Sequence, residues 1–244
     1  MRVEIWSDVA CPWCYIGKRR FERALGTFAD RETVQVTWRS FQLDPARPRG
    51  RRESLEATLG AKYGAPPDQV RTMNERVSGI AAAEGLEYRL DRYQVVNTFD
   101  AHRLIHLAAR SGRGTDAHER LLRAQLIEGE DLEEPATLVR LGGEVGLDPA
   151  ASKDLKLPDG AAAYRMDTRR LAQRRFDAPP FECVRGKPLV PITSIGANEA
   201  RTMATELARH LLARWPNMEG LPEEAARSAR SEEHTSELQS PYVI

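Results

Sequence analysis

Apolar positions near the start of the chain change from alternating to helical spacing. Residues 3–6 alternate like a half-buried β-strand that ends at the polar pair Ser7-Asp8. Between residues 11 and 28 the apolar side chains recur at i, i+4 and i+7, as on one face of a helix. Alternation returns at residues 34–38, which predicts a second strand. A strand, a helix and a strand at this spacing predict a βαβ unit with parallel strands.

Residues 53–175 carry almost continuous helical periodicity. The predicted amphipathic helices lie at residues 70–81, 97–108, 121–126, 135–145 and 160–176. Because each of these helices has an apolar stripe, they need a shared core, and we expect a helical domain inserted into the chain.

Strand character returns at residues 181–184 and 189–192, with the turn Gly186-Lys187 between them. A final amphipathic helix is expected at residues 197–214. The order β-α-β, helical block, β-β-α predicts an α/β protein with a thioredoxin-like fold and a large all-helical insertion.

The expected domains follow these changes of pattern. Residues 1–45 and 176–216 form a discontinuous thioredoxin-like domain, residues 53–175 form the helical insertion, and residues 217–229 form a linker. Residues 230–244 resemble the translation of a sequencing-adapter oligonucleotide. We expect this tail to be foreign and disordered, and we assign it no function.

Composition narrows the class of protein. The chain has 244 residues, of which 41% are hydrophobic and 30% charged, and its formal net charge is +0. This balance predicts a globular protein with neither a nucleic-acid-binding surface nor a membrane-surface patch. No apolar run approaches the ~20 residues of a membrane span, and the early first strand leaves no room for a signal peptide. We therefore expect a cytoplasmic protein, and the sequence carries no signal for its oligomeric state.

The motif Cys11-Pro12-Trp13-Cys14 lies where the first strand gives way to the helix. Cys11 is expected at the helix N-cap, with Pro12 at the first helical position, where its missing N–H is no loss. Unpaired backbone N–H groups and the positive end of the helix dipole then favour the thiolate of Cys11. The basic residues at 18–20 add positive charge nearby.

Two thiols at this spacing predict thiol–disulfide exchange. We expect Cys11, nearer the helix end and more exposed, to react first, and Cys14, one turn deeper, to resolve the mixed disulfide. The alternative is a structural pair or half of a zinc site, which needs further ligands. The only other cysteine is Cys183, expected to be a buried strand residue, so no metal site is predicted.

Three other residues are candidates for the same site. Trp13 lies between the cysteines and is expected to offer apolar contact to a substrate. Asp8, just ahead of the motif, is expected to tune the thiolate or to accept a proton. His102 shares a helical face with apolar residues, so it either assists proton transfer from Cys14 or only packs in the core.

A series of motifs carries a family resemblance. They are VEIWSDVACPWCYIGKRRFE at 3–22, WRSFQLDP at 38–45, MNERV at 73–77, AAAEGL at 81–86, NTFDAHRL at 97–104 and EGEDL at 128–132. In order and spacing they closely resemble the FrnE-like branch of the DsbA thioredoxin-like family, strongly over residues 1–146 and more weakly to about residue 215. The resemblance implies a thioredoxin fold with an inserted helical domain and a protein disulfide oxidoreductase or isomerase activity. It assigns the redox role to Cys11 and Cys14.

The resemblance also implies that Pro180 is a cis-proline that faces the two cysteines and shapes a groove for an extended substrate segment. Pro179 departs from the usual pattern, because it has no N–H to offer to such a segment. Pro179 and Pro180 are therefore candidate substrate-binding residues with an altered grip. The alternative is that this pair only marks the passage from a loop to a strand.

Three functions remain open at this point. The first is a dithiol oxidoreductase that acts on protein or small-molecule disulfides, needs no metal or organic cofactor, and is regenerated by glutathione or thioredoxin. The second is a glutathione-dependent enzyme resembling the kappa-type glutathione transferases and 2-hydroxychromene-2-carboxylate isomerases. Those typically have serine at the first active-site position, so the intact Cys11–Cys14 pair argues against this alternative. The third is a chaperone-like module that binds unfolded clients.

Overall fold

A parallel pair of strands begins the fold. The computed structural model describes residues 2–148, in which β1 (Arg2–Ser7) lies beside β2 (Gln35–Ser40), from Arg2 opposite Gln35 to Ser7 opposite Ser40. The helix α1 (Pro12–Gly26) and the short 3-10 turn η1 (Arg31–Thr33) connect the two strands. The βαβ unit predicted from the sequence is confirmed.

Helix α1 packs its apolar stripe against the first strand. Phe21 and Phe28, spaced as predicted, are buried in one cluster with Val3 and Ile5 of β1. The helix ends at Gly26, where the hydroxyl of Thr27 donates to the carbonyl oxygen of Ala24 at 3.0 Å. This packing fixes the start of α1 at the carboxyl end of β1.

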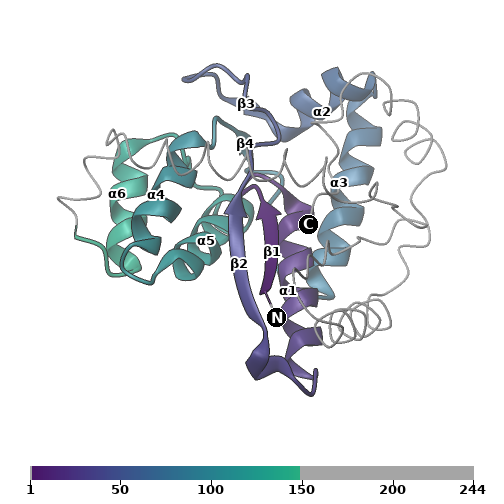
Figure 1. Ribbon diagram of the computed structural model, residues 1–244. Helices are drawn as coiled ribbons and strands as arrows, with labels where there is room; N and C mark the ends of the chain where they lie inside the picture. The colour runs from purple at the N-terminus through teal and green to yellow at the C-terminus, as the bar shows by residue number, and fades with distance from the viewer. Residues whose placement is uncertain (1, 149–244) are drawn as a thin grey trace, which may run out of the picture.

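Helices make up most of the described residues from 53 to 148, which we call the helical part. They are α2 (Leu55–Tyr63), α3 (Pro67–Ala82), α4 (Phe99–Ala109), α5 (Gly114–Arg123), η2 (Ala124–Glu128) and α6 (Pro135–Glu144). In the view of Figure 1, α1 and α3 lie to the right of the strand pair, and α4, α5 and α6 lie to its left. The helices predicted over residues 70–81, 97–108 and 135–145 are confirmed as α3, α4 and α6.

Two features of this helical part were not predicted. Strands β3 (Glu53–Ser54) and β4 (Gln94–Val95) form a short antiparallel pair, which is too brief to show alternation in the sequence. The helix predicted at residues 121–126 is instead the end of α5 followed by the π-helix η2, which closes at Gly129 with φ 72°. A Cβ at this glycine would lie 2.9 Å from the Cβ of Arg92, so the turn requires glycine.

One apolar core joins the Cys11–Cys14 motif to the helical part. The turn and first helical residues, Val9, Tyr15 and Ile16, are buried in the same cluster as Leu104 of α4 and Leu121 of α5. The residues next to the cysteines are therefore held by the helices, not by the strand pair alone.

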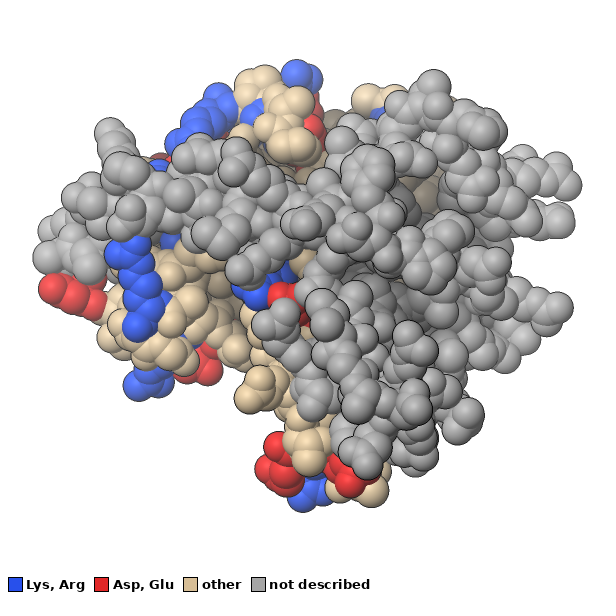
Figure 2. All heavy atoms as spheres, in the orientation of Figure 1, with Lys and Arg blue, Asp and Glu red and all other residues tan. Residues whose placement is uncertain are grey.

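Charged side chains on the surface are largely arranged in pairs. In the arginine-rich loop at residues 44–52, Arg49 hydrogen-bonds Asp100 at 2.7 Å and Arg52 pairs with Asp131. The visible described surface in Figure 2 correspondingly carries small groups of both signs.

Several predictions concern residues outside those that the structure describes. They are the helices at 160–176 and 197–214, the strands at 181–184 and 189–192, the domain limits beyond residue 148, the tail at 230–244, and Pro179, Pro180 and Cys183.

Candidate active site

Cys11 and Cys14 lie at the start of α1, as predicted. Cys11 is the N-cap residue in an extended conformation, and Pro12 occupies the first helical position. The N–H of Cys11 donates to the carbonyl of Asp8 at 3.1 Å, and the N–H of Cys14 donates to the carbonyl of Cys11 at 3.1 Å. Both cysteines are free thiols in this structure.

The prediction that Cys11 is the more exposed cysteine is wrong. Cys11 is 2% exposed and Cys14 is 8% exposed. The reason is the packing of the helical part over the motif, because Tyr88 and Tyr93 belong to the core cluster and reach the backbone on either side of Cys11.

These two tyrosines form a clamp on the motif. The hydroxyl of Tyr88 donates to the carbonyl of Pro12 at 2.6 Å, and the hydroxyl of Tyr93 donates to the carbonyl of Ala10 at 2.7 Å. Burial raises the pKa of both phenols well above the ordinary value, and nearby acidic groups, chiefly Cys11 at Tyr88 and Asp8 at Tyr93, act in the same direction. Both hydroxyls therefore stay protonated and act as donors.

The two thiols titrate as a pair. The hydrogen bond between them, with burial second, raises the pKa of Cys11 well above its ordinary value. The same hydrogen bond lowers the pKa of Cys14, because the Cys14 thiolate accepts the S–H of Cys11. Burial opposes this shift, while the backbone N–H of Asp8 and the hydroxyl of Ser7 support it. In the reduced pair this hydrogen bond thus favours a thiolate at Cys14 over one at Cys11.

In the reduced pair the predicted thiolate at Cys11 is opposed first by the hydrogen bond to Cys14, which raises the pKa of Cys11. Burial and the negative charge of Asp8 oppose it, and the one backbone N–H donated to its sulfur does not outweigh them. The basic residues at 18–20, which were expected to favour a thiolate at Cys11, form ion pairs with other residues. Lys18 and Arg19 pair with Glu119, and Arg20 bonds to Glu84 at 2.7 Å.

Asp8 and His102 lie together beneath the motif. Nε2 of His102 lies 3.2 Å from Oδ1 of Asp8, and both side chains are buried. The carboxylate of Asp8 also accepts the backbone N–H of Ala10 at 3.2 Å and that of Leu43 at 2.8 Å. Its negative charge raises the pKa of both cysteines. Of the two predicted modulators, Asp8 thus acts on the sulfurs, and His102 contacts Asp8.

A second buried histidine was missed in the sequence. Nε2 of His118, on α5, lies 2.9 Å from the hydroxyl oxygen of Ser7, at the end of β1. Both side chains are 2% exposed. No local signal marks the pair, since the two residues are 111 positions apart, although His118 precedes the predicted apolar stripe of its helix by one turn.

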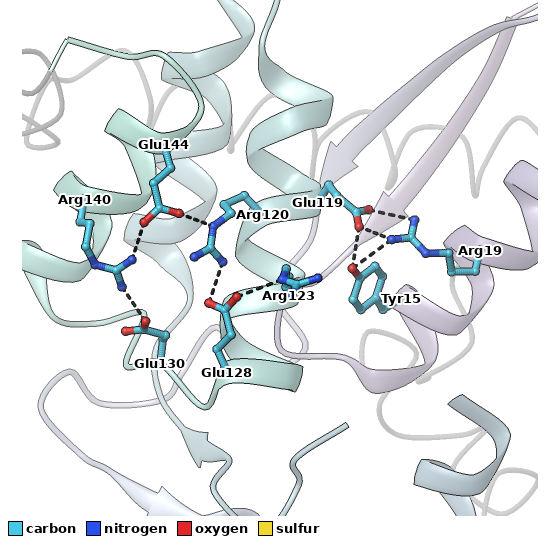
Figure 3. A network of polar contacts seen from close by, with 9 residues as sticks. All are labelled: Tyr15, Arg19, Glu119, Arg120, Arg123, Glu128, Glu130, Arg140 and Glu144. Atoms are coloured by element: carbon cyan, nitrogen blue, oxygen red, sulfur yellow. Dashed lines mark hydrogen bonds and ion pairs between the residues drawn. The ribbon is translucent and has the colours of Figure 1, made fainter. Parts of the chain in front are cut away.

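An ion-pair network ties the helix of the motif to the helical part. Glu119 of α5 accepts the hydroxyl of Tyr15 at 2.5 Å and pairs with Arg19 of α1. Figure 3 shows these side chains converging, and beside them a second group in which Arg120 bonds to Glu128 at 2.8 Å. Tyr15 directly follows Cys14, so the network holds the first turn of α1 in place.

The remaining candidates are placed as follows. Trp13 is half-buried and packs against the core cluster of the helical part. Pro179 and Pro180 lie outside the described residues. Within residues 2–148, no three or more histidine, cysteine, aspartate or glutamate side chains gather as metal ligands would. Across the same residues, no helix is both long and apolar enough to cross a membrane.

The fold and this site define a class of protein. A family model described as DSBA-like thioredoxin domain matches residues 2–208. The chain therefore belongs to the DSBA-like thioredoxin family, and the thioredoxin-like fold class predicted from the sequence is confirmed.

Three solved structures are similar. A probable DsbA oxidoreductase, SCO1869 from Streptomyces coelicolor, is 36% identical with a TM-score of 0.72, over 88% of this chain and 92% of that chain. The cytosolic disulfide reductase DsbM from Pseudomonas aeruginosa, solved with GSH, is 20% identical with a TM-score of 0.50, over 74% and 83%. A 2-hydroxychromene-2-carboxylate isomerase is 12% identical with a TM-score of 0.52, over 74% and 83%. The last two share the fold.

Proposed function

We propose that this protein is a thiol–disulfide oxidoreductase whose Cys11 and Cys14 exchange a disulfide with protein or small-molecule thiols. The observation that carries the proposal is the placement of two hydrogen-bonded thiols at the start of α1, with Cys11 as its N-cap. The lowered pKa of Cys14 favours the loss of one proton from the pair. Thiol–disulfide exchange needs a thiolate formed in this way.

In the reducing direction, the proton shared by the two sulfurs passes to Cys14, and the Cys11 thiolate attacks a substrate disulfide. The substrate S–S bond breaks, and one substrate sulfur leaves with the electron pair as a thiolate. Cys14 then loses its proton and attacks the sulfur of Cys11 in the mixed disulfide. The second substrate thiolate leaves, and two electrons have passed from the enzyme to the substrate.

Asp8 and His102 are proposed as modulators of these steps. The negative charge of Asp8 raises the pKa of both sulfurs, so it restrains the loss of their protons. His102 lies 3.2 Å from Asp8 and orients that carboxylate. We expect Asp8→Asn to lower the pKa of the pair, measured by the ultraviolet absorbance of the thiolate.

A small thiol can regenerate the cysteine pair at the end of the cycle. The reductase DsbM was solved with GSH, and on this support we propose glutathione, or alternatively thioredoxin, as the partner that regenerates the pair. The proposed catalyst needs no metal or organic cofactor. We propose that it works in the cytoplasm, where the glutathione pool is reducing.

The test is the reduction of insulin by dithiothreitol in the presence of the purified protein. Cys11→Ser is expected to abolish catalysis, and Cys14→Ser to accumulate a mixed disulfide that mass spectrometry detects. The matched control is Cys183→Ser, the same substitution at the cysteine outside the motif, which is expected to keep its activity.

Other outcomes point to other functions. Unchanged turnover by Cys11→Ser would refute the assignment. Glutathione-dependent isomerisation that survives Cys11→Ser would favour the isomerase, and suppression of aggregation by the double serine variant would favour the client-binding module.

A further inference from the structure

A line of buried polar side chains leads from α5 to the second cysteine of the motif. Nε2 of His118 lies 2.9 Å from the hydroxyl oxygen of Ser7, and the Ser7 hydroxyl in turn hydrogen-bonds the sulfur of Cys14. His118 and Ser7 are each 2% exposed, and Cys14 is 8% exposed. Water is therefore largely excluded from all three groups.

The ring of His118 is held in one orientation. It lies against the indole of Trp38 on β2, with 4.9 Å between ring centroids and 31° between the ring planes. Its Nδ1 is buried and has no hydrogen-bond partner within residues 2–148. Among the described residues, Ser7 is thus the hydrogen-bond partner of the imidazole.

The imidazole of His118 is neutral at physiological pH. Burial lowers its pKa to about 3, and the charges of Lys18 and His102 act in the same direction. Glu119 and Asp8 act against them and do not compensate. A neutral imidazole with so low a pKa is a weak base for the reaction, and its one ring N–H can donate a single hydrogen bond.

The position of that proton decides what Ser7 can do. A serine hydroxyl has one hydrogen to donate and can accept two. If Nε2 of His118 carries the proton, Ser7 accepts from it and its own hydrogen is free for the Cys14 sulfur. The opposite tautomer would leave a buried N–H at Nδ1 without a partner, which is rarer in proteins than an unpaired acceptor.

We propose that His118 and Ser7 are positioning residues, in which Nε2–H of His118 donates to Ser7 and thereby directs the Ser7 hydroxyl at the sulfur of Cys14. The inference rests on the proposed function, because the Ser7 hydroxyl has this role only if Cys11 and Cys14 exchange disulfides. When a substrate thiolate attacks Cys11 of the oxidised pair, the S–S bond breaks and its electrons pass to Cys14. The Ser7 hydroxyl then stabilises the departing thiolate.

The test is a titration of Cys14 in a background that carries Cys11→Ser and Cys183→Ser, so that the ultraviolet absorbance of the thiolate reports on Cys14 alone. Ser7→Ala is expected to raise the pKa of Cys14 by about one unit, as the loss of one hydrogen bond to a charged group implies. His118→Phe is expected to raise it by a similar amount. The double variant is expected to show no further rise, because the two residues act as one unit.

Conservative and matched variants complete the design. Ser7→Thr keeps a hydroxyl and His118→Gln keeps an N–H donor, so both are expected to retain most of the lowered pKa of Cys14. Ser40→Ala is the matched control, since Ser40 is buried and pairs with Ser7 across the sheet but lies on β2. It is expected to leave the titration of Cys14 unchanged.

An unchanged pKa of Cys14 in Ser7→Ala would overturn the inference, as would additive shifts in the double variant. The titration requires no turnover, so its result is independent of the insulin assay. Insulin reduction that depends on Cys11, together with an unmoved pKa in Ser7→Ala, would reject the positioning pair and leave the proposed function standing.

Discussion

At the scale of single residues, the tyrosine clamp is the clearest structural support of the motif. The Tyr93 hydroxyl satisfies the carbonyl of Ala10, next to Cys11. Tyr93→Phe leaves that buried carbonyl without its partner, so we expect the free energy of unfolding to fall by about 1–2 kcal/mol. Urea denaturation measures the change. The control is Tyr63→Phe, whose ring is 48% exposed and which is expected to alter stability by less than about 0.5 kcal/mol.

A second residue-scale prediction concerns His118 and pH. Its pKa is about 3 in the folded protein and has its ordinary value, 6.5, in the unfolded chain. Between these values the unfolded chain binds more protons, so folding stability is lost as pH falls below the unfolded value. We expect the wild type to lose about 1 kcal/mol per pH unit more than His118→Phe between about pH 6 and pH 4. Equal slopes in urea titrations of the two proteins would contradict the burial of a neutral imidazole.

At the scale of elements, Glu119 joins α5 to α1. It accepts the Tyr15 hydroxyl and pairs with Lys18 and Arg19. We expect Glu119→Gln to lower the free energy of unfolding by about 1–2 kcal/mol, because the buried Lys18 loses a charged partner. The control, Glu22→Gln, removes a more exposed partner of the same two cations within α1 and is expected to cost less. Equal losses of unfolding free energy in the two variants would show that the link between α1 and α5 does not add to the stability of the protein.

The turn after η2 gives a second element-scale prediction. Gly129 has φ 72°, and an added Cβ would meet that of Arg92. We expect Gly129→Ala to destabilise the protein by about 1–3 kcal/mol. Gly143→Ala offers the opposite case, since Gly143 lies within α6 and an added Cβ would meet no atom within 4 Å. There the same substitution is expected to stabilise by about 0.5–1 kcal/mol. Thermal denaturation measures both variants, and we expect the midpoint of unfolding to fall in Gly129→Ala and to rise in Gly143→Ala.

Local patterns explain what the sequence could predict. The N-cap Cys11, the first-turn Pro12 and the stripe of α1 are set by residues a few positions apart, so periodicity and capping rules predict them. The partners of the motif are set by tertiary contacts. Tyr88 reaches Pro12 of the motif across 76 positions, and His118 reaches Ser7, ahead of the motif, across 111 positions. No local rule predicts such contacts. The burial of Cys11 follows from tertiary contacts of this kind, which is why the sequence predicted a more exposed Cys11 than the structure shows.

At the scale of the whole molecule, the helical part takes part in the chemistry proposed for the thioredoxin-like part. Its loop supplies Tyr88 and Tyr93, and its helices supply His102 and His118. The turn before α1 shares one core with α4 and α5. The strand–helix–strand unit belongs to the DSBA-like thioredoxin family fold. The helices of the helical part bury the two sulfurs and supply their polar neighbours.

The most direct test of the central claim is the redox equilibrium of the Cys11–Cys14 pair in glutathione buffers of graded ratio. Cys183→Ser is used so that only the motif retains thiols, and intact mass and peptide mapping follow the products. We predict a reversible two-electron transition in which the chain loses two hydrogens and a disulfide joins Cys11 to Cys14. Thiols that stay reduced in every buffer, or that form glutathione adducts without closing this disulfide, would contradict the account.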